Sequence, residues 1–159
     1  MGTITLSGLL SAPSKSMTQK WQKAVQTAMH KSATKQNNRK SAAENPAFSY
    51  RWEHVQAVVK TGKKLAELTG ADVEIIEAAA WLHDICKEAG DQHPQEGAKY
   101  ARRFLPKTDF PSKKIEAVAY VIEAHMGLWR KKPLKNLEAQ VLWDADKLTK
   151  IGVLAAVHW

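Results

Sequence analysis

The segment 71–93, "ADVEIIEAAAWLHDICKEAGDQH", decides the fold, because it is apolar along most of its length and yet contains an adjacent histidine and aspartate. Asp72 can cap a helix that we predict over 73–88, and Gly90 is a natural end for it. A helix that is apolar on every side is enclosed by other elements. Burying an ionised carboxylate such as Asp84 without a partner is costly, so this side chain needs a cation, hydrogen-bond donors or a metal.

Apolar residues recur at helical spacing on both sides of this segment. The helix predicted before it carries Val58, Leu65 and Leu68 on one face, and a helix predicted after it carries Ile122 and His125 on one face. Alternating strand patterns, glycine-rich phosphate loops and internal repeats are absent from the sequence, which therefore predicts an all-α fold. The predicted helices span residues 17–32, 50–68, 73–88, 94–105, 112–125 and 136–149, with the start of another in 151–159.

The composition is that of a soluble globular protein, since 44% of the 159 residues are hydrophobic and 25% are charged. This length suits one domain with a single core. No apolar run approaches the roughly 20 residues of a membrane span, and we recognise neither a secretory signal nor a myristoylation site. The one cysteine, Cys86, cannot form an internal disulfide. We therefore expect a cytoplasmic protein that does not cross a membrane.

The net charge of +8 is concentrated near the N-terminus. Residues 1–50 carry seven Lys or Arg against one acidic residue, a net charge of +6, whereas residues 51–159 carry 17 against 15, a net charge of +2. We interpret residues 1–49 as a basic N-terminal helix followed by a polar linker over 31–49, and residues 50–159 as the main helical domain. A basic segment without interleaved aromatic residues is more often a solvated surface, so we expect contact with nucleic acid, if any, only through this segment.

Side chains with metal-ligating groups lie on apolar helix faces. They are His54, the pair His83 and Asp84, His125, and Asp146 one turn after Leu142. Taken singly, each has an ordinary interpretation as a hydrogen-bonded core histidine or a salt-bridged carboxylate, and Asp84 can pair with Lys87 three residues later. Taken together, imidazoles and carboxylates on separate helices are the ligands that Mn, Fe, Co, Ni, Zn and Mg sites use. The set therefore favours a divalent metal site.

The ordered pattern of His, His-Asp and Asp resembles that of the HD-domain phosphohydrolases, a superfamily of helical metal-dependent enzymes. The resemblance runs over residues 50–153 and is carried by "YRWEHVQAVV" with His54, "WLHDICK" with His83 and Asp84, and "LWDADKLTKIG" with Asp146. It extends through "HPQEGAKYARRFL" and "KIEAVAYVIEAH" to a subgroup with a last motif like "DADKL…IG". It implies an HD-domain helical bundle with an N-terminal helical, basic extension, in which those four residues bind one divalent metal.

Two features of the implied site stay open from the sequence. Helical phase does not choose between Asp144 and Asp146, although the family motif places the ligand at Asp146. Some HD enzymes hold a second metal through two further histidines, with the HD aspartate bridging, and His93 and His125 match those positions. Because His93 precedes a proline at a helix start, where it has an alternative role as a cap, the sequence is consistent with one ion or two.

The reaction that the resemblance implies is hydrolysis of a phosphate ester or anhydride by metal-activated water, on a nucleotide or another small phosphorylated metabolite. Asp84 and Lys87 are the expected catalytic residues, the lysine facing a phosphate from one turn beyond the His-Asp pair. An alternative is a non-catalytic helical module with a vestigial HD site that senses a ligand or binds RNA or another partner. Candidate substrate-binding residues, which are alternatively solvated or salt-bridged surface residues, are Arg51, Trp129, Arg130, Lys131, Lys132 and Lys147.

The C-terminal segment "IGVLAAVHW", 151–159, is an apolar run without a cap. Relatives of the resembled subgroup usually continue beyond this point with further helices. We therefore expect either a shortened form of a longer protein, or a segment that packs against the domain or mediates self-association.

Overall fold

The computed structural model describes residues 20–40, 50–127 and 130–151, and within these ranges every regular element is a helix. The prediction of an all-α fold is confirmed. No helix in the described ranges is long and apolar enough to span a bilayer. The α-helices are α1 (Trp21–Lys40), α2 (Tyr50–Thr69), α3 (Val73–Leu82), α4 (His93–Phe104), α5 (Ile115–Ala124) and α6 (Leu137–Ile151), and the 3-10 turns are η1 (Lys87–Gln92), η2 (Leu105–Lys107) and η3 (Ser112–Lys114).

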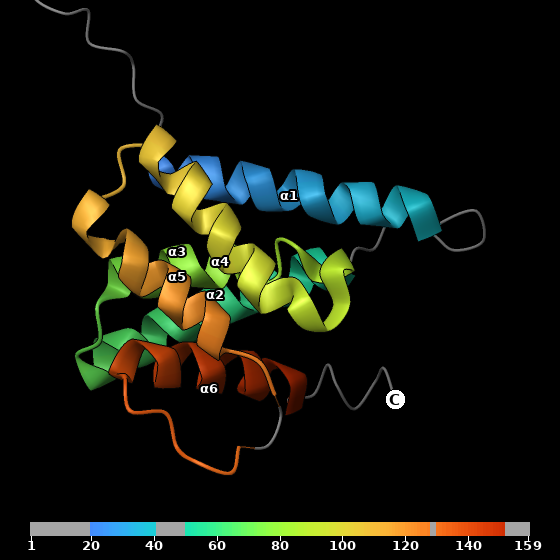
Figure 1. Ribbon diagram of the computed structural model, residues 1–159. Helices are drawn as coiled ribbons and strands as arrows, with labels where there is room; N and C mark the ends of the chain where they lie inside the picture. The colour runs from blue at the N-terminus through green and yellow to red at the C-terminus, as the bar shows by residue number, and fades with distance from the viewer. Residues whose placement is uncertain (1–19, 41–49, 128–129, 152–159) are drawn as a thin grey trace, which may run out of the picture.

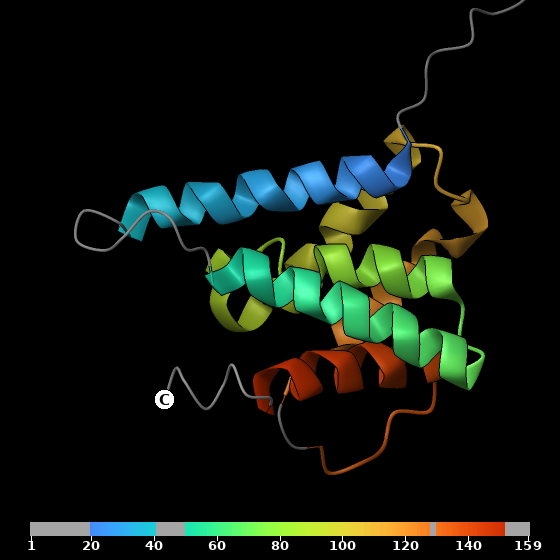
Figure 2. The same ribbon diagram turned by 180° about the vertical axis from the view of Figure 1, so that it is seen from behind.

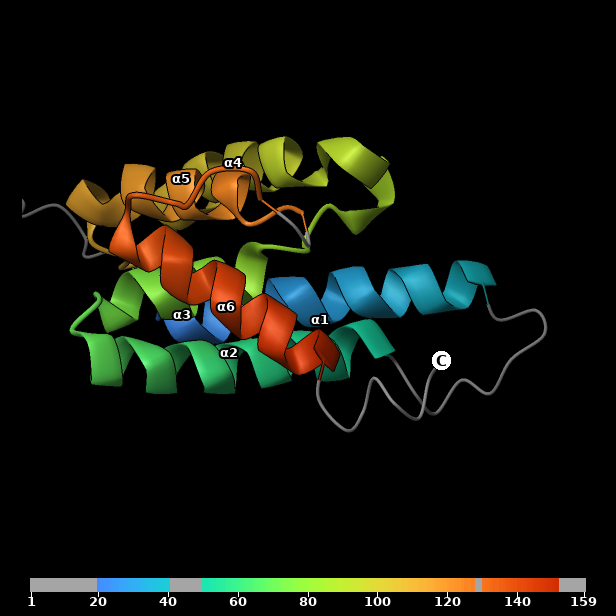
Figure 3. The same cartoon turned by 90° about the horizontal axis from the view of Figure 1, so that it is seen from below.

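Helix α3 is the central element and contacts α1, α2, α5 and α6. Figure 1 shows α1 across one end of the bundle and α6 at the opposite end. The view from behind in Figure 2 shows α2 and α3 running side by side between them. Helices α4 and α5 pack against each other in a layer on the side away from α2 (Figure 3). This enclosure explains why α3 is apolar on all sides.

The N-terminus of α3 forms as the sequence predicts. Gly70, with φ of +78°, lets the chain leave α2 in a left-handed conformation. The Asp72 carboxylate then accepts hydrogen bonds from the backbone N–H groups of Glu74 (3.0 Å) and Ile75 (3.3 Å), as a helix cap does. The cap fixes the residue at which the central helix begins. It therefore also sets the position of the other end of the helix, which the His-Asp pair follows.

The C-terminus of α3 contradicts the prediction of a helix that continues to Glu88. The helix ends at Leu82, and the chain continues through turns into η1. The His83 side chain bonds to the Ala80 carbonyl, which is the acceptor that residue 84 would use in a continuing α-helix. Gly90 then adopts φ of +59° and ψ of −129°, outside any helical conformation. The His-Asp pair therefore lies in a tight turn, which we call the HD turn (residues 83–86).

Helix α1 is longer than the predicted helix over 17–32, because it continues to Lys40. Residues 31–40, which we interpreted as part of a linker, are therefore helical. Val25, Met29 and Ala33 repeat every four residues and are buried in the same core as α3, which explains the continuation. The ends of the predicted segments, residues 17–19 and 41–49, lie outside the described part of the chain, and a domain boundary at residue 49 stays a prediction.

The buried face of α2 differs from the predicted one at its end. Val58, Gly62 and Ala66 are buried at intervals of four residues. Leu68 is two positions beyond this stripe and is 69% exposed, so the expectation that it lies on the apolar face is wrong.

The last two helices fall close to their predicted ranges. Helix α5 begins after η3, and His125 directly follows its last residue. In α6, Asn136 caps the first turn by accepting a hydrogen bond from the backbone N–H of Ala139 at 2.8 Å. Residues 152–159 lie outside the described part of the chain, so self-association through this segment stays a prediction.

Candidate metal centre

The HD turn supplies the middle of the site. His83 is 1% exposed, and its Nδ1 lies 2.8 Å from the carbonyl oxygen of Ala80. Because a carbonyl oxygen only accepts, Nδ1 carries the proton, and Nε2 of the neutral ring presents its lone pair. Within the described part of the chain, this Nε2 has no hydrogen-bond partner. A buried lone pair is unfavourable when left alone and suits a cation.

His93 and His125, which we call the α4–α5 side of the site, repeat this arrangement. Nδ1 of His93 donates to the Gly90 carbonyl (2.6 Å), and Nδ1 of His125 donates to the Ile122 carbonyl (2.5 Å). Their Nε2 atoms face each other at 3.2 Å and lie 3.3 and 3.9 Å from Oδ1 of Asp84. Two lone pairs at this separation repel unless a cation or a proton lies between them. The geometry therefore fits a bound metal ion.

Gly97 lets α4 approach the HD turn closely. A Cβ atom at this position would lie 3.1 Å from Cγ2 of Ile122 and 3.5 Å from the carbonyl oxygen of His83. The approach brings His93, one turn earlier on the same helix, to the carboxylate of Asp84. We did not predict this role from the sequence, because a glycine inside a helix gives no local sign of what packs against it.

His54 on α2 and Asp146 on α6 form what we call the α2–α6 side. Nε2 of His54 lies 3.1 Å from Oδ1 of Asp146, and Nδ1 of His54 lies 3.4 Å from the hydroxyl oxygen of Thr149, a contact that the sequence did not indicate. Asp146 is 1% exposed, whereas Asp144 is an exposed residue. Of the two aspartates that the sequence left open, the structure brings only Asp146 to the histidines.

Two groups of buried ligand atoms share one carboxylate. Within each group, the ligand atoms lie within 4.8 Å of one another. Asp146 adjoins the first group through its contact with His54. Imidazole nitrogens and carboxylate oxygens in this arrangement fit a divalent metal such as Mn, Fe, Co, Ni or Zn. The groups are His54, His83 and Asp84, and Asp84, His93 and His125.

The electrostatics of the site keep these groups in the protonation state that a metal requires. Burial lowers the pKa of His125 to about 3, and the neighbouring His83 adds to the shift. Burial also lowers the pKa of His83. Burial by itself raises the pKa of Asp84, but the neighbouring His83, the contact with His93 and the charge of Lys87 outweigh it and hold that pKa well below its usual value. Near neutral pH the two rings are uncharged and the carboxylate is ionised, as metal binding demands.

Three lysines surround the carboxylates, and two of them were expected from the sequence. Nζ of Lys87 lies 3.1 Å from Oδ1 of Asp84, and the side chain is 39% exposed, so it stands between the site and solvent. Lys147 is buried, and its Nζ bonds to Oδ2 of Asp146 (2.5 Å) and to the His125 carbonyl (3.2 Å). These contacts tie α6 to the end of α5 and do not direct the ammonium to solvent.

The third lysine, Lys150, was missed. Its Nζ lies 2.9 Å from Oδ1 of Asp146, and the spacing of four residues on one helix was the signal that could have identified it. Burial by itself raises the pKa of Asp146, but the contact with His54, the neighbouring His83 and the charges of Lys150 and Lys147 outweigh it and hold that pKa well below its usual value. The Asp146 carboxylate is therefore charged and compensated by two ammonium groups.

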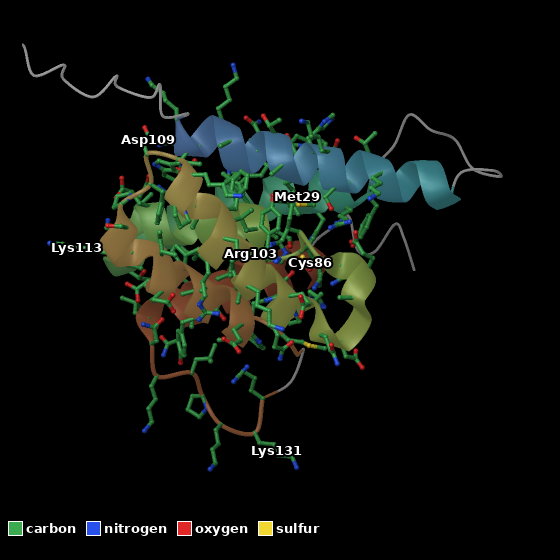
Figure 4. All side chains as sticks on the ribbon, turned by 45° about the horizontal axis from the view of Figure 1, so that its top comes forward. Met29, Cys86, Arg103, Asp109, Lys113 and Lys131 are labelled. Atoms are coloured by element: carbon green, nitrogen blue, oxygen red, sulfur yellow. The ribbon has the colours of Figure 1, made fainter. Side chains whose placement is uncertain are left out.

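The other predicted substrate-binding residues lie in different surroundings. Arg51 is buried, and its guanidinium contacts the Asp84 carbonyl, Ser32 and Glu88, so a phosphate contact by this residue stays a prediction. Arg130 donates to the Ala124 carbonyl at the end of α5 (3.1 Å). Lys131 and Lys132 are exposed, and Figure 4 shows Lys131 at the edge of its loop, pointing away from the body. Trp129 lies outside the described residues.

Fold and site together define an all-α protein with a buried cluster of histidines and aspartates suited to a divalent metal. Residues 51–151 match the family model described as "HD domain". The chain belongs to the HD domain family, as its resemblance in sequence implied. The match begins at Arg51, so α1 lies outside it.

A solved structure supports the same family. The chain is similar to a predicted HD superfamily hydrolase from an uncultured Thermotogales bacterium, with a TM-score of 0.65 and 26% sequence identity over 86% of this chain and 72% of that one.

Among curated proteins, the chain is similar to short parts of bifunctional uridylyltransferase/uridylyl-removing enzymes. The identity is 42% over 52 residues with the enzyme of Rhodopseudomonas palustris, and 32% over 69 residues with that of Nitrobacter winogradskyi. These matches cover 33% and 43% of this chain but only 6% and 8% of the relatives' lengths.

Proposed function

We propose that this protein is a metal-dependent phosphohydrolase that cleaves a phosphate ester or anhydride of a nucleotide or another small phosphorylated metabolite. The observation that carries the proposal is the pair of buried ligand groups that share Asp84. A vestigial site would not be expected to retain every imidazole and both carboxylates in one buried cluster. Membership of a family with a solved hydrolase neighbour agrees with this proposal.

The residues have separate tasks in this proposal. His54, His83, Asp84 and Asp146 would hold one divalent ion, and His93 and His125 would hold a second with Asp84 between them. Such ions supply an activated water and offset charge on the phosphoryl oxygens. The backbone carbonyls that bind each Nδ1 keep the rings of His83, His93 and His125 in one orientation.

Lysine side chains next to the carboxylates favour an anionic substrate. Lys87 and Lys150 are each partly exposed and contact Asp84 and Asp146, so each ammonium can reach a phosphate that approaches the ligand cluster. The two lysines would hold the phosphate while the buried rings stay fixed. This arrangement supports Lys87 in the catalytic role and adds Lys150 as a substrate contact.

The nucleotide class rests on two further observations. Tyr50 is 53% exposed and its ring stacks on His54 with centroids 6.1 Å apart, which places an aromatic surface beside the ligand cluster. The curated relatives are named for removal of a uridylyl group, which is a nucleotide attached through its phosphate. A nucleotide with its base near Tyr50 and its phosphate near Lys87 is the pose that we favour.

The test is a turnover assay of the purified chain with Mn, Co, Ni or Mg against a panel of nucleotides and small phosphorylated metabolites. Asp84→Ala should abolish metal-dependent turnover, because it removes the shared ligand. Asp91→Ala is the matched control, since Asp91 is an exposed carboxylate in the adjacent turn. Absence of metal-dependent turnover on every substrate, with a nucleotide still stabilising the fold, would support a non-catalytic sensing module instead.

A further inference from the structure

A hydroxyl group on α1 reaches the backbone of the HD turn. The Ser32 hydroxyl donates to the Ile85 carbonyl at 2.9 Å, and it also accepts a hydrogen bond at 3.1 Å from the guanidinium of Arg51 on α2. The same Arg51 Nη2 donates to the Asp84 carbonyl. Two adjacent carbonyls of the HD turn are therefore held by one connected pair of side chains from two other helices.

These carbonyls need such donors because the HD turn has left the α-helix. The backbone N–H of Lys87 reaches back to the Asp84 carbonyl at 3.2 Å, a spacing of three residues in place of the helical four. A buried carbonyl without a partner is unfavourable, so the Ser32 hydroxyl satisfies the Ile85 carbonyl, and Arg51 adds a second donor at the Asp84 carbonyl. Together these bonds stabilise this particular course of the main chain. The course of the chain at residue 84 sets the direction in which its carboxylate points.

Helix α1 holds Ser32 firmly in place. Met29 and Ala33, one turn before and one residue after Ser32, are fully buried in the core. The ring of His30 packs edge-on against Trp52 of α2, with centroids 4.9 Å apart. The start of α1 is tied by the backbone N–H of Trp21, which donates to the Asp109 carboxylate at 2.6 Å. The Ser32 hydroxyl therefore has a fixed position relative to the core and to the HD turn.

We propose that Ser32 and Arg51 are positioning residues for the metal centre, which fix the HD turn so that the Asp84 carboxylate faces both groups of histidines. This inference rests on the proposed function, because it takes the ligand cluster to bind metal. It makes α1, which lies outside the matched family segment, a working part of the site. It also assigns Arg51 to the protein backbone and not to the substrate.

The test measures Mn²⁺ affinity by calorimetry and the absorption spectrum of the Co²⁺-loaded chain. Ser32→Ala should weaken Mn²⁺ binding by roughly 10-fold, which is the lower end of the loss seen when a residue that orients a metal ligand is removed. It should also alter the Co²⁺ spectrum. Ser32→Thr keeps the hydroxyl and should restore both values. Arg51→Lys, which keeps the charge but loses the forked donor, should weaken binding as well.

The matched control is Thr34→Ala, because the Thr34 hydroxyl on the exposed side of α1 bonds only to its own helix at the His30 carbonyl, among the contacts described. It should leave Mn²⁺ affinity and the Co²⁺ spectrum unchanged. A purely structural role for Ser32 predicts a lower urea midpoint with unaltered metal affinity, and that result would overturn the inference. A wild-type chain that binds no metal would overturn the proposed function itself, so the two failures are distinguishable.

Discussion

The α4–α5 side and the α2–α6 side of the centre balance their charges in different ways. On the α4–α5 side, His93 and His125 bring two neutral nitrogen atoms to 3.2 Å, and Asp84 is the carboxylate beside them. On the α2–α6 side, the Asp146 carboxylate already contacts Lys147 and Lys150. A cation entering the first side relieves repulsion between lone pairs, whereas one entering the second competes with ammonium groups. We therefore expect the two sides to respond differently to substitution.

The largest effect should come from removing what the two sides share. Asp84→Asn keeps the size of the side chain but removes its charge, and both ligand groups lose their common oxygen. We expect turnover to fall roughly 1,000-fold, which is the loss typical of removing a group that stabilises charge in the transition state. Elemental analysis should find little metal per chain, because both sides lose their ion. Retention of metal by Asp84→Asn, at the level of an Asp91→Asn control, would contradict a shared ligand.

Acid should unfold the metal-free chain through the histidines before it acts on the carboxylates. The lowered pKa values of His83 and His125 mean that the unfolded chain binds protons below about pH 6.5 while the folded chain does not, so stability falls as the pH drops toward 3. The loss by pH 4 should be on the order of 3 kcal/mol. Asp84 and Asp146, with lowered pKa values, add a further loss only as the pH falls below the usual carboxyl range.

Urea titrations at several pH values measure this dependence. His125→Gln removes one of the two rings whose pKa is lowered and should flatten the slope between pH 6.5 and 4. An unchanged slope in this variant would show that the α4–α5 side does not carry the acid sensitivity.

A substitution on the α4–α5 side alone tests whether a second ion matters. His93→Ala should reduce the metal content from two ions per chain to one and lower turnover by about 10-fold, because one group keeps all its ligands. Gln95→Ala, at an exposed position on the same helix, is the matched control. If the variant and the control have equal metal content and turnover, the centre holds a single ion.

The smallest effect should come from the lysine that compensates Asp146. Lys150→Met removes an ammonium group whose side chain is partly exposed, so its contribution is modest. We expect metal affinity on the α2–α6 side to rise about 3-fold, since the carboxylate no longer has a competing partner. The same variant should raise KM for the phosphorylated substrate. Weaker metal binding in this variant would mean that Lys150 supports the site and does not compete with it.

The sequence predicted the helical fold, the family and the residues that the structure gathers around Asp84, because ligands and apolar stripes leave signs within each helix. It did not predict the end of α3, since periodicity cannot register the bond between the His83 side chain and the Ala80 carbonyl. It also did not reveal Ser32 and Gly97. Their roles come from contacts across helices, with Ile85 and Ile122, that no spacing along the chain displays.

The hydrogen bonds from histidine Nδ1 to a carbonyl three residues earlier determine whether metal binding would release protons. The proton of His83 and of His125 is already on the nitrogen that faces the backbone, and burial keeps the other nitrogen bare at neutral pH. Filling the centre then liberates no proton from these two rings. The heat contributed by these two rings would be the same in buffers of different ionisation enthalpy, and the uptake of metal would not acidify the solution through them.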